Sequence, residues 1–330
     1  MTISVCIPTY NQSAYIKSAV YSAFHQTLKP DEIIVLDDCS TDDTFDIIKA
    51  LESEIPILKV QRQSKNMGIS RNVNDCLRMA SGDFVVRLDS DDQLLPAYIQ
   101  KLASMMIKYP KAGYGHVAIQ EVDQYDRDLR TRVLFRSAIY QSPDDALKAA
   151  VNGYRVAANI IMFRRSALEE VNFIEASANF AEDYYLSVAL AAKNFGNVYV
   201  DEVLAKYRIW VDVGNVRQKR KLEEIIGIRN VFENALFPAF SLKGWKTQVL
   251  LDKRASLASR QADCLGWKIY NQAEQAQIID ELMKLSSDQK VKFAAWIYRN
   301  NLGAFLKLTS NIKRLPSLII KKALKAYKQL

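Results

Sequence analysis

Histidine and cysteine are scarce in this chain of 330 residues, which contains two histidines and four cysteines. The cysteines are far apart, form no C-x-x-C pair and have no paired histidines, so a structural zinc site is not expected. They fit the reduced and mostly buried thiols of a cytoplasmic protein. The four are Cys6, Cys39, Cys76 and Cys264.

Long apolar runs are also lacking. No window of about 18 residues is apolar throughout, so no transmembrane helix is expected. The first residues have neither the basic nor the apolar segment of a secretory signal, and none is expected. With 11 glycines and 8 prolines the chain is neither collagen-like nor of low complexity. Its length fits about two domains.

Acidic residues are missing from the last part of the chain. The rest has 35 basic and 37 acidic residues and is nearly neutral, although the whole chain has a net charge of +8. A nucleic-acid-binding domain is expected to be basic more uniformly, so no nucleic-acid partner is predicted. The ten basic residues that follow Asp288 are Lys290, Lys292, Arg299, Lys307, Lys313, Arg314, Lys321, Lys322, Lys325 and Lys328.

The last 18 residues, 313–330, have the pattern of a basic amphipathic helix, with apolar residues on one face and lysines on the other. Such a helix can lie on an anionic membrane surface. Its apolar face can equally pack on the protein's own helices, and the sequence leaves both alternatives open. The first would make a cytoplasmic protein peripheral to the cytoplasmic face of the inner membrane.

Short apolar runs alternate with helical patterns over the first hundred residues. Strands are predicted at residues 3–8, 33–36, 57–62 and 84–88. Fully apolar strands between helices predict a mostly parallel sheet that is flanked by helices and buried on both faces, as in Rossmann-like α/β folds. Ligands of such sheets bind beyond the carboxyl ends of the strands. The acidic clusters at residues 37–38 and 89–92 both fall at those ends.

The pattern changes further along the chain. Additional strands are predicted at residues 114–122, 132–135, 157–163 and 198–209. After about residue 218 only helical patterns remain, at residues 222–235, 245–270, 273–285 and 288–308. These patterns predict an α/β domain over residues 1–214, a helical C-terminal region over 215–312, and the basic tail over 313–330.

The run Asp89-Ser90-Asp91 follows an apolar strand. Alternate carboxylates can turn toward one hard cation, and Mg²⁺ or Mn²⁺ needs only a few such oxygens beside substrate phosphates. Alone, a D-x-D run is weak evidence, because a solvated turn or a helix cap has the same composition. The spacing of an EF-hand calcium loop is absent.

Four motifs occur in a fixed order over residues 3–92. They are Pro8-Thr9-Tyr10-Asn11, Asp37-Asp38-Cys39-Ser40-Thr41-Asp42, Asn66-Met67-Gly68-Ile69-Ser70-Arg71-Asn72, and Gly82-Asp83 leading into Leu88-Asp89-Ser90-Asp91-Asp92. This run closely resembles the family 2 glycosyltransferases. The resemblance implies a GT-A fold and an inverting transfer of a sugar from a nucleotide-sugar donor.

The resemblance also implies roles for individual residues. Those expected to contact the nucleotide sugar are Pro8, Thr9, Tyr10, Asn11, Asp38, Asn66, Gly68, Arg71, Asp89 and Ser90. The ring of Tyr10 can stack on the base, and the Asp38 carboxylate can accept a hydrogen bond from the uracil ring, which favours a UDP-sugar. Asp89 and Asp91 are expected to hold Mn²⁺ or Mg²⁺, with Asp91 as the principal ligand.

A later run, Glu182-Asp183, matches the catalytic segment of the family. An inverting transferase needs one base beside the acceptor hydroxyl, and the resemblance assigns that role to Asp183, with Glu182 as its neighbour. The alternative for both acids is a structural role, because acidic residues are favoured at the start of a helix.

Two positions depart from the family pattern. Cys39 stands where the family usually has glycine, which costs about 1 kcal/mol if the position needs a positive φ. A slightly different turn is expected there. Trp210 stands where the family often has a metal-binding histidine, so the cation would depend on Asp91, water and diphosphate oxygens.

The resulting hypothesis is a glycosyltransferase that acts on a glycan or lipid-linked glycan acceptor in cell-surface polysaccharide synthesis. Three alternatives remain. A nucleotidyltransferase could share the sheet, but it needs a glycine-rich basic loop where residues 9–13 have neither feature. A non-catalytic glycan- or membrane-binding subunit with a relict fold stays open because the histidine is missing. A nucleic-acid binder would rest on the tail alone.

Overall fold

The computed structural model describes residues 1–136, 138–173, 180–210, 216–300 and 302. The chain divides into two compact units, residues 1–211 and residues 212–330, whereas the sequence placed the division after residue 214. The predicted tail over residues 313–330 lies outside the described residues.

The first unit is built on one sheet of ten strands, counted within the described residues. The path through the sheet is β3-β2-β1-β4-β9-β6-β10-β5, with β7 paired to β6 and β8 paired to β10. The strands are β1 (Ile3–Thr9), β2 (Glu32–Asp37), β3 (Leu58–Arg62), β4 (Phe84–Arg87), β5 (Gln93–Leu94), β6 (Ala112–Val122), β7 (Asp128–Arg132), β8 (Tyr140–Gln141), β9 (Ile161–Arg164) and β10 (Gly196–Arg208).

Strands β3, β2, β1 and β4 are all parallel, and β10 is parallel to β6. Between these two groups, β9 runs antiparallel to both β4 and β6. The predicted α/β fold with a mostly parallel sheet is confirmed. Strand β9 reverses in the middle of the sheet, and the short strands β5, β7 and β8 also pair antiparallel to their neighbours. The strand predicted at residues 132–135 is wrong, because β7 ends at Arg132 and no strand covers residues 133–136.

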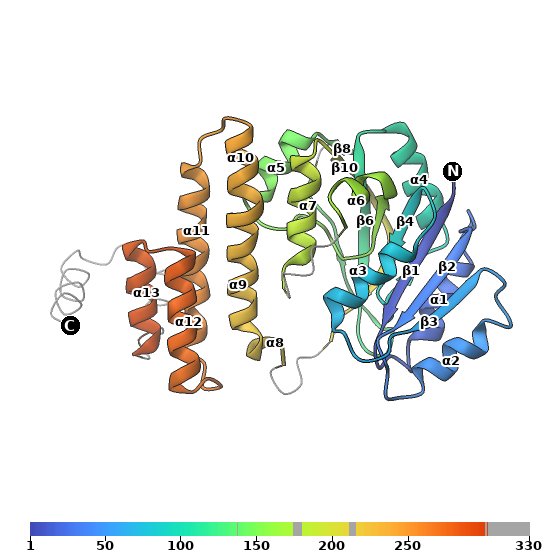
Figure 1. The fold of residues 1–330 in the computed structure, drawn as a ribbon, viewed down its shortest axis with the longest axis horizontal. Helices are drawn as coiled ribbons and strands as arrows, with labels where there is room; N and C mark the ends of the chain where they lie inside the picture. The colour runs from blue at the N-terminus through green and yellow to red at the C-terminus, as the bar shows by residue number, and fades with distance from the viewer. Residues whose placement is uncertain (137, 174–179, 211–215, 301, 303–330) are drawn as a thin grey trace. The chain divides into compact units, whose positions relative to one another are not determined.

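Helices cover both faces of the sheet (Figure 1). One face packs against α1 (Ile16–Phe24), α2 (Thr44–Leu51) and α4 (Tyr98–Lys108), and the other against α3 (Ile69–Met79), α6 (Arg165–Glu170) and α7 (Glu182–Ala192). A further helix, α5 (Pro143–Ala150), packs on α7.

The alternation of side chains along β1 explains why its sequence is mostly apolar. Val5 and Ile7 belong to the core under the first group of helices, whereas Cys6 between them belongs to the core under the second. Because both faces are buried, every second position cannot be polar as it would be in a half-exposed strand. Full burial of one such side chain contributes about 1.5–3 kcal/mol.

One glycine of the fourth motif is fixed by packing against β1. A Cβ atom added to Gly82 would lie 2.8 Å from the backbone nitrogen of Ser4, which is closer than real Cβ contacts. The amide of Gly82 also donates a hydrogen bond to the Ser4 hydroxyl at 2.9 Å. Gly82 therefore allows β4 to begin directly beside β1, and this sets the register that brings their carboxyl ends together.

The second unit is helical throughout its described part, as predicted. Its core includes Ile225, Ala258, Leu282 and Val291, and Asn271 caps α12 through a capping box with Glu274. No described helix combines the length and apolar character needed to cross a membrane. The elements are α8 (Val216–Lys219), α9 (Lys221–Val231), the π turn η2 (Phe232–Leu236), α10 (Phe237–Leu242), α11 (Gln248–Gln261), the 3₁₀ turn η3 (Ala262–Gly266), α12 (Gln272–Leu285) and α13 (Gln289–Arg299).

Candidate active site

A cavity of about 450 Å³ opens at the carboxyl ends of β1, β2, β4 and β10 in the first unit. Of the residues predicted from the sequence, it is lined by Pro8, Thr9, Tyr10, Asp38, Asn66, Gly68, Asp89, Ser90 and Asp91. The other lining residues are Gln12, Ile69, Asn72, Val73, Tyr207, Arg208 and Trp210. Asn11 and Arg71 are not among the lining residues. Strands β1 and β2 pair in parallel, with Thr9 directly beside Asp37. The loops that follow the two strands therefore start at the same edge of the sheet.

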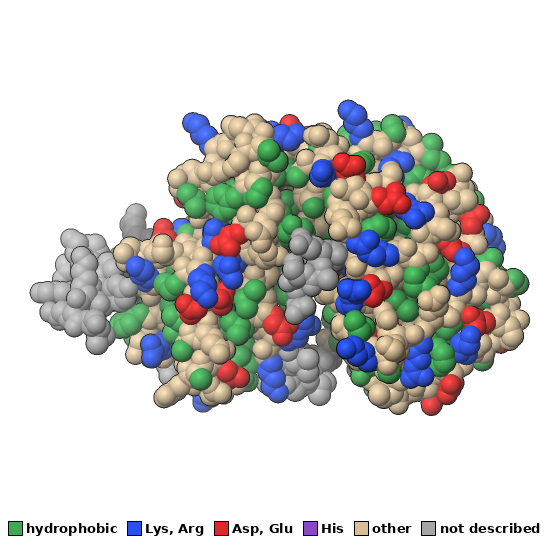
Figure 2. All heavy atoms as spheres, in the orientation of Figure 1, with side chains coloured by type: hydrophobic (Ala, Val, Ile, Leu, Met, Phe, Trp, Pro, Cys, Tyr) green, Lys and Arg blue, Asp and Glu red, His purple; other side chains and the backbone are tan. Residues whose placement is uncertain are grey.

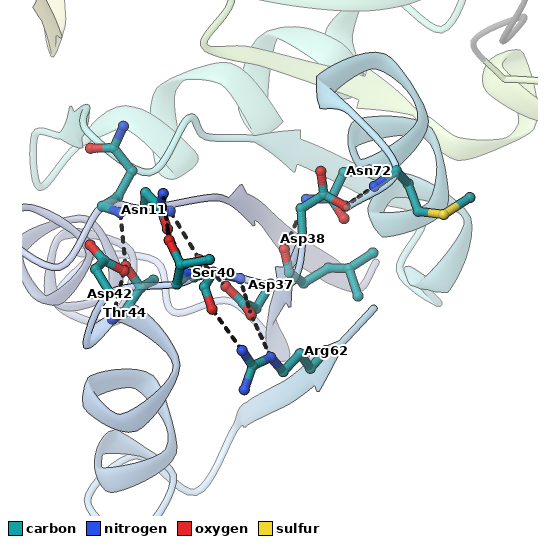
Figure 3. A network of polar contacts seen from close by, with 12 residues as sticks. Asn11, Asp37, Asp38, Ser40, Asp42, Thr44, Arg62 and Asn72 are labelled. Atoms are coloured by element: carbon teal, nitrogen blue, oxygen red, sulfur yellow. Dashed lines mark hydrogen bonds and ion pairs between the residues drawn. The ribbon is translucent and has the colours of Figure 1, made fainter. Parts of the chain in front are cut away.

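A polar network lies next to the lining residues Tyr10 and Asp38 (Figure 3). The carboxylate of Asp37 is fully buried. It accepts hydrogen bonds from the amide and the hydroxyl of Ser40. It also forms an ion pair with Arg62 at 3.1 Å. The Ser40 hydroxyl in turn accepts from the amide of Asn11 at 2.9 Å, and the side-chain oxygen of Asn11 accepts from the amide of Thr41 at 2.8 Å. Asp37 and Asn11 thus join the loops after β1 and β2.

Cys39 lies in the same loop with a φ of +61°. This is the left-handed region that favours glycine, so the backbone cost of about 1 kcal/mol anticipated from the sequence applies here. The carboxylate of Asp37 and the side chains of the network above hold the loop in this conformation.

Asp38 lines the cavity and holds the loop that precedes α3. Its buried carboxylate accepts hydrogen bonds from the amides of Met67 at 2.7 Å and Gly68 at 2.9 Å. Gly68 is the N-cap of α3 and has a φ of +83°, and its amide also donates to Asn66 at 3.1 Å. Each carboxylate oxygen can accept a second hydrogen bond, so Asp38 retains capacity for a ligand. Arg71 instead pairs with Asp75 on the surface of α3 at 2.9 Å.

Three carboxylates crowd the floor of the site. Asp89 pairs with Arg87 at 3.0 Å, Asp91 accepts from the indole of Trp210 at 2.6 Å, and Asp92 accepts from the amide of Arg208 at 2.8 Å. The second oxygen of Asp92 is buried without a partner among the described residues. Burial raises the pKa of Asp91 and of Asp92, and the neighbouring negative charges raise both further.

The donor set of this floor fits a hard divalent cation. Asp89 and Asp91 both line the cavity, and Mg²⁺-like ions are commonly held by one or two carboxylates together with water and substrate phosphates. No group of three His, Cys, Asp or Glu residues within the described ranges could hold a metal ion by itself. The residues therefore suit a cation that is shared with a bound diphosphate rather than one in an all-protein cage.

The predicted base, Asp183, lies in the first turn of α7 and does not line the cavity. One of its oxygens is 2.5 Å from a terminal nitrogen of Arg87, while the Nε of the same guanidinium donates to Asp89. Arg87 is only 2% exposed. A single buried cation therefore joins Asp183 to the floor of the cavity. Glu182 precedes Asp183 and is partly buried.

The environment of Asp183 favours a proton-accepting role. Burial raises the pKa of this carboxyl to about 6, even though the positive charge of Arg87 acts in the opposite direction. Glu182 and Asp89 raise the pKa further. For Arg87, burial alone would lower the pKa, but the charges of Asp183 and Asp89 outweigh it and raise the pKa above its usual value.

Sequence reasoning missed Arg87, although the chain carries a signal for it. Arg87 is the one charged residue in the otherwise apolar strand β4, and a charge in a fully buried strand must be paired. The role of Arg208 had no comparable signal. It donates to the backbone oxygens of Asp91 at 2.9 Å and Asp123 at 2.6 Å, contacts that only the folded chain brings together.

Residues 4–171 match the model of the family described as Glycosyl transferase family 2. Because this match covers half of the chain, the chain belongs to that family.

Two curated relatives are each 29% identical to this chain. The GalNAc(5)-diNAcBac-PP-undecaprenol beta-1,3-glucosyltransferase of Campylobacter jejuni aligns over 63% of this chain and 65% of its own length, just under two thirds. The putative teichuronic acid biosynthesis glycosyltransferase TuaG of Bacillus subtilis aligns over 63% of this chain and 79% of its own.

Solved structures share the fold. The crystal structure of Staphylococcus aureus TarS 1-349 has a TM-score of 0.63 at 18% identity and covers 91% of this chain and 92% of its own. The mannosyltransferase PcManGT from Pyrobaculum calidifontis, solved with GDP-Man and Mn²⁺, has a TM-score of 0.56 at 16% identity over 94% of this chain and 88% of its own. The predicted GT-A type fold and membership of family 2 are thus confirmed.

Proposed function

We propose that the chain is an inverting glycosyltransferase that moves one sugar from a UDP-sugar to a glycan or lipid-linked glycan acceptor in cell-surface polysaccharide synthesis. The observation that carries this proposal is the arrangement around Arg87. The cavity lined by the nucleotide-sugar motifs and the buried carboxylate of Asp183 meet at one guanidinium. Glycosyl transfer requires a donor site and, beside it, a base whose pKa suits proton transfer near neutral pH.

The donor would bind in the cavity at the ends of β1, β2 and β4. Tyr10 is 42% exposed, so its ring can stack on a base, and Asp38 can accept a hydrogen bond from the N3–H group of uracil. Family relatives support this donor class, because TarS has been solved with UDP and with UDP-GlcNAc. Asn66 and Gly68 would approach the diphosphate through the amino-terminal end of α3, where backbone N–H groups favour anions.

A divalent cation, Mn²⁺ or Mg²⁺, would be held by Asp89 and Asp91 and would neutralise charge on the leaving diphosphate. The proton is handled by the protein. Asp183, with one oxygen fixed by Arg87, accepts the proton of the acceptor hydroxyl as the hydroxyl oxygen bonds to the anomeric carbon and the bond to the diphosphate breaks. A pKa of about 6 leaves this carboxyl mainly ionised at neutral pH.

Calorimetric titration with UDP, dTDP, GDP and CDP, each with and without Mn²⁺, tests the donor site. We expect UDP to bind more tightly with Mn²⁺ than without it. Replacing Asp91 with asparagine should remove most of that difference, because the amide loses the charge that attracts the cation. If none of the four nucleotides binds, the alternative of a non-catalytic subunit with a relict fold is favoured instead.

The acceptor and the location are proposed from the relatives. The Campylobacter jejuni protein and an Escherichia coli glucosyltransferase at 27% identity are both named for undecaprenol-linked acceptors. A lipid-linked acceptor would place this chain at the cytoplasmic face of the inner membrane, with the basic tail over residues 313–330 as its peripheral contact.

Among the described residues, the face of the molecule drawn in Figure 2 has no continuous basic surface, because its Lys and Arg side chains are interspersed with Asp and Glu.

Deletion of the chain from Lys313 onward tests the role of the tail. We expect the shortened protein to lose sedimentation with vesicles that contain anionic lipid, since each basic residue near such a surface contributes about 1 kcal/mol. Vesicles of neutral lipid are the control. Unchanged binding to the anionic vesicles would assign the apolar face of the tail to the protein itself.

A further inference from the structure

Trp210 holds the carboxylate that the proposed cation would need most. It follows β10, lines the cavity and is 48% exposed. Its indole nitrogen donates a hydrogen bond of 2.6 Å to Oδ2 of Asp91. An indole N–H group is a donor only, so Trp210 cannot ligate a cation through its nitrogen. Its contribution to a cation site must pass through Asp91.

Aromatic and cationic side chains keep Trp210 in this position. The ring of Tyr15 packs edge-on against that of Trp210, with centroids 5.3 Å apart. The guanidinium of Arg208 lies over the ring of Tyr15, 4.2 Å from its centroid. Arg208 also donates to the backbone oxygen of Asp91 at 2.9 Å. One buried arginine thus contacts both the ring that packs on Trp210 and the backbone of Asp91.

A donor on a carboxylate can either compete with a cation or orient the carboxylate for it. Competition would prevail if the cation needed both oxygens of Asp91. Small divalent ions such as Mg²⁺ prefer octahedral coordination and keep several waters, so one oxygen from each carboxylate suffices. With Oδ2 held by Trp210, Oδ1 is left to meet the cation, and less freedom of rotation is lost on binding. Groups that orient a ligand in this way raise metal affinity about 10–100-fold.

We infer that Trp210 is a positioning residue for the divalent cation, and that it supplies by orientation what a histidine would supply by ligation. The inference rests on the proposed function, since it concerns the cation of that site. It makes the affinity for the cation depend on the indole N–H group and not only on the shape of the aromatic ring.

The test measures Mn²⁺ binding to the full chain with saturating UDP, from the electron paramagnetic resonance signal of free Mn²⁺. Replacing Trp210 with phenylalanine keeps an aromatic wall but removes the N–H donor, and we expect a loss of affinity of about tenfold or more. Replacing Trp210 with histidine adds a ligand, and we expect affinity at least equal to that of the parent. Trp245→Phe, in the second unit, is the matched control and should leave Mn²⁺ affinity unchanged.

Tryptophan fluorescence tests separately whether Mn²⁺ binds beside Trp210. Paramagnetic Mn²⁺ should quench part of the emission of the parent chain and of the Trp245→Phe variant, and that part should be missing from Trp210→Phe. Equal or tighter binding of Mn²⁺ by Trp210→Phe would overturn the positioning role alone. If the parent chain binds UDP but no Mn²⁺, the cation site of the proposed function and the role of Trp210 both fail, while the nucleotide site stands.

Discussion

Asp183→Asn is expected to lower kcat by at least about 100-fold, because positioned proton transfer contributes about 10²–10⁴-fold to such reactions. The amide of asparagine keeps the shape of the side chain and can still contact Arg87, but it cannot accept a proton. Asp183 does not line the cavity, so UDP should bind this variant with nearly unchanged affinity. Steady-state transfer assays and calorimetry on the same preparation separate the two effects.

The pH profile provides a sharper form of this test. Only the ionised carboxylate can act as the base, and the pKa of Asp183 is raised to about 6. Activity should therefore be full above this pH and should fall about tenfold per unit below it. Glu202→Gln, at an exposed carboxylate paired with Lys101, serves as the control and should leave the profile unchanged. Turnover by Asp183→Asn at the parental rate would exclude Asp183 from the mechanism.

The residues that line the cavity could be predicted to lie together because several of them follow strands of a parallel sheet. Once residues 3–8, 33–36 and 84–88 are recognised as buried parallel strands, their carboxyl ends must lie along one edge. The motifs after them then converge without knowledge of any side-chain contact. The same reasoning could not place Arg71, whose side chain turns to its helical neighbour Asp75, four residues away.

The other contacts of the site depend on chain crossings that periodicity does not encode. Arg87 and Asp183 are 96 residues apart, and Trp210 and Asp91 are 119 apart. The first pair meets where β9 lies antiparallel beside β4, and the second meets because β10, which precedes Trp210, pairs with β5, which follows Asp91. A local apolar pattern also led to a wrong strand prediction where an apolar side chain is in fact exposed. Phe135, in the strand wrongly predicted at residues 132–135, is 99% exposed.

The helical region shows a similar limit. A single helix was expected over residues 245–270, but α11 begins at Gln248 and gives way at Ala262 to the 3₁₀ turn η3. Buried side chains on both segments belong to one core with Leu282 and Val291. Packing against α12 and α13 thus decides where α11 stops, and propensity alone is too weak to show it.

Arg87→Met should have a large effect on both stability and catalysis. Methionine fills much of the same space but removes the cation between Asp89 and Asp183, each of which is left without its partner. Removing one member of a buried ion pair costs about 3–5 kcal/mol. Without the guanidinium, burial and the remaining acidic neighbours raise the pKa of Asp183 above about 6, so the acidic limb of the pH profile should move to higher pH.

A double-mutant cycle distinguishes this pairing from a general loss of packing. In Arg87→Met/Asp183→Asn both members of the pair are gone, and the urea midpoint should lie well above the value expected from adding the two single losses. Arg87→Lys keeps the positive charge but lacks the planar fork that reaches two carboxylates at once, so it should retain more stability than methionine while still shifting the pH profile. If the losses of Arg87→Met and Asp183→Asn simply add, Arg87 does not couple the base to the donor site, and Asp183 must be held in place by the first turn of α7 alone.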